Sequence, residues 1–160
     1  MRLSHLGLVA VLLAGCAGVP QQVASTSAIS QRSVDGPADA VRTRAERALR
    51  DAGLTPEATP GGGLRAVARG SADPSWADCQ RLVVRDESTE YVRSDWARPG
   101  ARETEVSVGL RPAGGGRTEV TVATETAATY TDRYRNLPFQ EACATTGALE
   151  RRLLDAVAAG

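Results

Sequence analysis

Apolar and polar positions alternate with two different periods along the chain, and these periods predict its helices and strands. Apolar residues recur at helical spacing over 41–52 and again over 149–157, with charged residues on the opposite side. Residues 104–111 alternate through Val106, Val108 and Leu110, residues 118–126 alternate through Val120 and Val122, and the glycine-rich stretch 112–116 separates them. The pattern predicts two amphipathic helices and one antiparallel hairpin.

Residues that favour helix ends flank both helical stretches. Asp35, followed by Gly36 and Pro37, offers an N-terminal cap for the first helix, and Gly53 is the expected stop. Thr145 or Thr146 can cap the last helix. That helix is expected to expose its charged residues, Glu150, Arg151, Arg152 and Asp155.

Shorter apolar runs predict further strands near Leu54 and over 64–69, 81–85 and 89–96, with an edge strand over 22–29. The order of elements indicates an α+β fold. We expect a two-layer domain, with an antiparallel sheet of about four to six short strands and two helices packed on one face. The other face of the hairpin should be wet, because it carries Glu105, Ser107, Glu119 and Thr121.

The N-terminus has the features of an export signal. An apolar run over 6–13 follows Arg2, and Pro20 lies well short of the roughly 20 apolar residues that a spanning helix needs. The run ends in Leu13-Ala14-Gly15-Cys16, which resembles the lipobox of bacterial lipoproteins. The alternative is an ordinary cleaved signal with a cysteine nearby.

The lipoprotein resemblance implies a lipidated Cys16 and a cut before it. Diacylglycerol and an acyl chain such as palmitate would then hold the protein to a membrane, since two or more chains anchor stably. Ala17 after the cysteine implies the periplasmic face of the outer membrane. The resulting organisation is a signal peptide over 1–15, a tether over 16–34 and a single domain over 35–160.

Three cysteines are present, and lipidation of Cys16 leaves Cys79 and Cys143 as an even pair. In an oxidising compartment such a pair usually forms a disulfide, and closing this loop stabilises a fold by roughly 4 kcal/mol. Two separate buried thiols are the alternative.

Composition excludes several kinds of chemistry. All 19 basic residues are arginine, and the only histidine, His5, lies in the signal peptide. The mature chain therefore has no histidine triad and no Schiff-base lysine, and we expect neither a metal nor a cofactor. The charge is balanced and no basic face is concentrated, so nucleic acid is not an expected partner. The run Gly114-Gly115-Gly116 joins two strands, which favours a hairpin turn over a phosphate-binding loop.

The few aromatic residues form the only candidate contact patch. It comprises Trp76, Trp96, Tyr130, Arg133 and Tyr134, which could contact a glycan or an envelope protein. Alternatively, the rings fill the edge of the core beneath the disulfide.

Two function classes remain open. The first is a noncatalytic lipoprotein, anchored at the outer membrane, that serves in binding or envelope assembly. The second is an enzyme acting on wall or envelope glycan through strand carboxylates, among them Glu103, Glu105, Glu119 and Glu125. Because solvated strand charges are much commoner than acid pairs, we favour the noncatalytic class.

Overall fold

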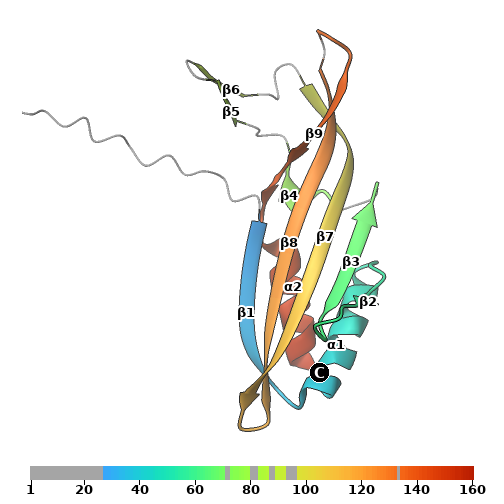
Figure 1. Cartoon of the computed structure of the whole chain (residues 1–160), viewed down its shortest axis with the longest axis vertical. Coiled ribbons are helices and arrows are strands. Elements are labelled where there is room, and N and C mark those ends of the chain that lie inside the picture. The colour runs from blue at the N-terminus through green and yellow to red at the C-terminus, as the bar shows by residue number, and fades with distance from the viewer. Residues whose placement is uncertain (1–26, 71–72, 80–82, 87–88, 93–96, 133) are drawn as a thin grey trace, which may run out of the picture.

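The structure, a computed structural model, describes residues 27–70, 73–79, 83–86, 89–92, 97–132 and 134–160 (Figure 1). An antiparallel sheet and two helices on one of its faces form an α+β domain, as the sequence predicts. The helices are α1 (Ala38–Asp51) and α2 (Ala148–Ala159). None of the described helices is long and apolar enough to cross a membrane.

A long hairpin forms the centre of the sheet. Its strands are β7 (Ala97–Gly114) and β8 (Arg117–Asp132), and the sheet order is β1-β8-β7-β3-β2, with β9 also pairing with β8. The other members are β1 (Ser27–Asp35), β2 (Glu57–Ala58), β3 (Leu64–Arg69) and β9 (Pro138–Ala142). The predicted hairpin is confirmed, but its strands are 18 and 16 residues long, not short.

The hairpin turns on two glycines. Gly115 and Gly116 both have positive φ, 58° and 74°, which is the requirement of the tight turn that matches the twist of paired strands. Gly114 pairs with Arg117 after a register shift at Pro112. The connection is therefore shorter than the predicted 112–116, because β7 continues almost to the turn.

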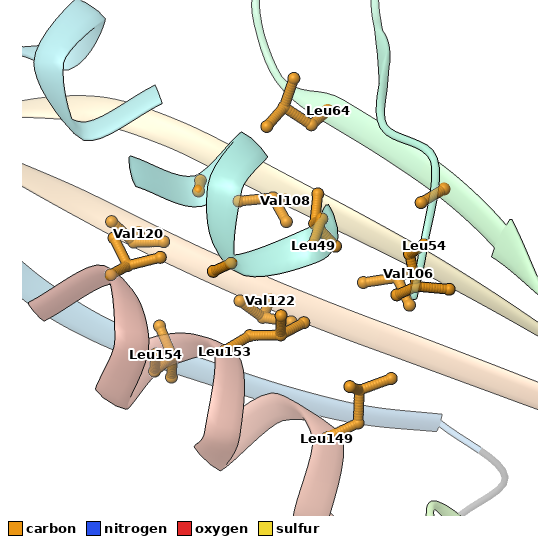
Figure 2. Packing of buried hydrophobic residues seen from close by; sticks show 14 of the residues in the cluster. Leu49, Leu54, Leu64, Val106, Val108, Val120, Val122, Leu149, Leu153 and Leu154 are labelled. Atoms are coloured by element: carbon orange, nitrogen blue, oxygen red, sulfur yellow. The ribbon is translucent and has the colours of Figure 1, made fainter. Parts of the chain in front are cut away.

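Both helices bury their apolar stripes against the same face of the sheet. In Figure 2, Leu153 and Leu154 of α2 face Val122 and Val120 of β8, and Leu149 belongs to the same core. On α1, buried Leu49 belongs to the same core as Val106 and Val108 of β7. The opposite hairpin face is exposed or half-buried, as expected for Glu105, Ser107, Glu119 and Thr121.

The ends of the helices differ in part from the prediction. Gly53 follows α1 with φ +78°, as expected, but Asp35 does not cap its start. Pro37 occupies the N-cap position, and the Asp35 carboxylate instead forms an ion pair with Arg117, whose Nε is 3.1 Å from Oδ1. Gly147 is the N-cap residue of α2, and the Thr146 hydroxyl accepts from the backbone N–H of Ala148 at 3.2 Å.

Several peripheral strands also differ from their predicted positions. The N-terminal edge strand occupies Ser27–Asp35, which includes the predicted residues 27–29, while 22–26 lie outside the described residues. The strand also takes in residues 30–34, which were assigned to the tether. Leu54 is buried in a loop, and the strand begins at Glu57. Two small separate sheets pair β5 (Val83–Asp86) with β6 (Thr89–Val92), and β4 (Ala77–Asp78) with β10 (Ala144–Thr145).

Candidate functional site

A disulfide joins Cys79 and Cys143 at the end of the sheet that β9 covers. The two Cα atoms are 4.6 Å apart, and both residues are buried. Cys79 follows β4 directly, and Cys143 lies between β9 and β10, so the bridge fastens the small β4–β10 sheet to the main one. A bridged domain is consistent with an extracytoplasmic location.

Tyr130 packs against this disulfide. Its hydroxyl donates to the backbone oxygen of Cys79 at 2.5 Å and lies 4.0 Å from the sulfur of Cys143. Its ring stacks on Phe139 of β9, with centroids 5.4 Å apart. Because only 2% of Tyr130 is exposed, the ring fills the core beneath the bridge, which is the alternative role that the sequence left open.

The other aromatic candidates do not join Tyr130 in one exposed patch. Trp76 is 7% exposed and belongs to the main core beneath the helices. Tyr134 is 87% exposed, in the turn between β8 and β9. Trp96 and Arg133 lie outside the described residues. The described part of the predicted patch is therefore divided between two core clusters and one exposed turn.

Charged side chains of the open sheet face are paired across strands. Arg65 of β3 donates two hydrogen bonds to the Glu105 carboxylate of β7, at 2.6 and 2.7 Å. Hydrogen bonding by Arg65 lowers the pKa of Glu105 below its ordinary value. Arg69 donates a single hydrogen bond to the Glu103 carboxylate, at 3.3 Å. Each of these two carboxylates therefore has an arginine partner on β3.

Two shallow hollows lie on this open face. The first, of about 260 Å³, is lined by Glu103, Glu105, Glu125, Thr126, Ala127, Gln140 and Ala142. The second, of about 430 Å³, is lined by Gln31, Ser107, Gly109, Arg111, Glu119, Thr121 and Ala123. Small-molecule sites are mostly lined by large apolar and aromatic side chains, and neither lining contains one. The face is therefore better suited to polar surface contacts than to enclosing a small ligand.

Glu150 differs most from its predicted place. The sequence pattern puts it on the exposed side of α2, yet it is fully buried. Its Oε1 accepts from the hydroxyls of Thr124 and Thr145, the latter at 3.3 Å, while Oε2 has no hydrogen-bond partner in the described structure. The contacts join α2 to β8 and β10. The only sign of this contact in the sequence is the row of threonines on the inward face of β8. Threonine occurs at both buried and exposed positions of strands, so the row does not predict a buried carboxylate.

Cys16 lies outside the described residues, so its lipidation remains a prediction. Among the residues that the structure describes, no group of three or more histidine, cysteine or acidic side chains is arranged to hold a metal ion. Neither the protein-family models nor the curated proteins contain a match to this sequence.

Proposed function

We propose that this protein is a noncatalytic lipoprotein, held by a lipidated Cys16 at the periplasmic face of the outer membrane, where its domain serves in binding or envelope assembly. The observation that carries the proposal is the disulfide between Cys79 and Cys143. It uses two of the three cysteines and needs an oxidising compartment to persist. Cys16, at the end of the lipobox-like sequence, is the remaining thiol.

The charges on the open face favour this proposal over the carboxylate-dependent enzyme. A glycosidase needs one carboxylic acid whose pKa is raised, so that it can protonate the leaving oxygen. Glu105 has the opposite setting, because the bidentate contact with Arg65 lowers its pKa. Glu103 also faces an arginine, Arg69. Glu105 is therefore suited to holding the sheet face and not to acid catalysis, and both carboxylates serve in cross-strand ion pairs.

The lipid anchor is tested in a Gram-negative host that expresses the full chain. Labelled palmitate should enter the wild-type protein and not Cys16→Ala, and the wild-type protein should fractionate with the outer membrane. The matched variant Ala17→Asp should keep the label but move to the inner membrane. Equal labelling of wild type and Cys16→Ala would refute the anchor.

The noncatalytic role is tested on the same preparations. A partner recovered in stoichiometric amount with the lipidated protein from detergent-solubilised envelope supports the binding role. Hydrolysis of envelope glycan by the wild-type protein, lost in Glu105→Gln, would instead establish the enzyme.

A further inference from the structure

The turn between β8 and β9 presents apolar side chains to solvent. Tyr134 is 87% exposed and Leu137 is 60% exposed, and the only other large apolar side chain of the described structure that is exposed is Ile29 on β1, at 71%. Arg135 between the first two is exposed as well. We call residues 134–137 the β8–β9 tip. Two large apolar side chains gathered at one exposed turn indicate a contact site.

The tip lies at the end of the domain where the chain enters from Cys16. Ser27, the first residue of β1, pairs with Glu125 of β8, and β1 runs antiparallel to β8. From Glu125, β8 continues for seven residues to Asp132, with β9 paired beside it. In Figure 1 the upper end of β1 is its start, and the tip lies above it at the top of the view. The β7–β8 turn is at the bottom.

Covalent geometry lets the tip reach a membrane that holds Cys16. Seven strand residues at about 3.3 Å each place the tip about 23 Å beyond the level of Ser27. Ser27 follows Cys16 by eleven positions, and a chain of that length spans at most about 36–40 Å. The attachment is therefore long enough for the tip to touch the bilayer and short enough to keep it close to the surface.

We propose that the β8–β9 tip docks into the surface of the bilayer to which Cys16 is anchored, so that the domain is held in one orientation. The inference rests on the proposed lipid anchor. A tyrosine ring suits the membrane interface, a leucine suits the acyl boundary just below it, and an arginine is attracted to anionic headgroups. The β7–β8 turn with Gly115 and Gly116 would then point away from the membrane.

The tip has a rigid support. Tyr130 and Phe139, on the two strands that lead into it, stack on each other, and the backbone N–H of Cys143 donates to Thr126 at 2.8 Å. The disulfide fixes the same end to Cys79. A contact between the tip and another surface would therefore fix the orientation of the whole domain.

The test places a tryptophan at the tip and another at the far end of the hairpin. Tyr134→Trp and Ala113→Trp both replace exposed residues, so neither should disturb the fold. The mature chain from Cys16 is coupled through this thiol, the only one outside the disulfide, to maleimide lipid in vesicles of phosphatidylethanolamine and phosphatidylglycerol. The fluorescence of the wild-type protein, which comes from Trp76 and Trp96, is subtracted from that of each variant. The remaining emission is then compared between vesicles with and without brominated lipid.

We expect brominated lipid to quench the emission added at position 134 and to leave that at position 113 unchanged. Leu137→Asp, added to Tyr134→Trp, should remove the quenching. Equal quenching at positions 134 and 113 would overturn the tip contact. A blue-shifted emission at position 134 that brominated lipid does not quench would overturn it too, because a protein surface would then cover the tip. Because the coupling is chemical, this result is independent of palmitate labelling in cells, which tests the anchor alone.

Discussion

Removing the disulfide should cost this domain a large part of its stability. The bridge joins residues 64 positions apart, and in the chain-entropy model a loop of that length constrains the unfolded state by about 4 kcal/mol. Domains of this size are stable by only about 5–15 kcal/mol. The double variant Cys79→Ala/Cys143→Ala should therefore lose between a quarter and most of its free energy of unfolding.

Urea unfolding followed by circular dichroism measures this loss. With a slope of about 2 kcal/mol per molar urea, 4 kcal/mol moves the midpoint down by about 2 M. All proteins carry Cys16→Ser, which removes the site of lipid attachment, so no detergent is needed. Cys79 and Cys143 are then the only cysteines in the parent protein. Reducing the parent protein with dithiothreitol should shift its midpoint by a similar amount.

A second variant separates the bridge from the packing around it. Tyr130→Phe removes the hydroxyl that donates to Cys79 and leaves a buried carbonyl without that partner, which should cost about 1–3 kcal/mol with the disulfide intact. A midpoint shift below about 0.5 M for the double alanine variant would refute the entropy argument, because it would mean a loss under about 1 kcal/mol. Two titratable thiols in the unreduced parent protein would refute the bridge itself.

Two further predictions concern the opposite faces of the sheet. Thr124→Val removes the hydroxyl that donates to the Glu150 carboxylate and should destabilise the domain by about 1–3 kcal/mol in urea unfolding. The control Thr121→Val, on the open face, should change the stability by less than about 0.5 kcal/mol. Equal effects of the two variants would count against a role for the buried contact. Arg65 lowers the pKa of Glu105 in the folded state, so the contribution of this ion pair is present above the ordinary value of 4.5 and is lost as the pH falls through the lower folded value. Because the pair is exposed, Glu105→Gln should cost under about 1 kcal/mol near neutral pH and nothing in acid, and a cost independent of pH would contradict the assignment.

The central hairpin and both helices could be predicted because large apolar side chains mark their buried faces. Val106 and Val108 alternate with polar residues on β7, as Val120 and Val122 do on β8, and the glycines between the strands permit the tight turn. The half of the hairpin next to β9 lacks this alternation of large apolar and polar residues. There the inward positions of β8 are Thr124, Thr126, Ala128 and Tyr130, all buried, and small or polar residues give no clear alternation.

The candidate sites were harder to predict because burial depends on contacts distant in sequence. Trp76 follows an irregular stretch with Asp73 and Pro74, so local pattern gives no sign that it joins the main core. Glu150 reads as exposed on a helical pattern, and only the meeting of α2 with β8 and β10 supplies its threonine partners. The cysteine pair was predictable from its number and the expected compartment alone, without geometry.

The distribution of core residues explains why the disulfide matters to this fold. Beneath the helices, leucines and valines from both layers fill the core. Beyond the helices, the buried cluster consists of Ala77, Cys79, Ala128, Tyr130 and Cys143, with Phe139 packed against it. Two alanines bury little apolar surface, so the disulfide and one tyrosine ring must hold this end together. Since the same end carries the β8–β9 tip, reduction should loosen the proposed membrane contact before it unfolds the helical end.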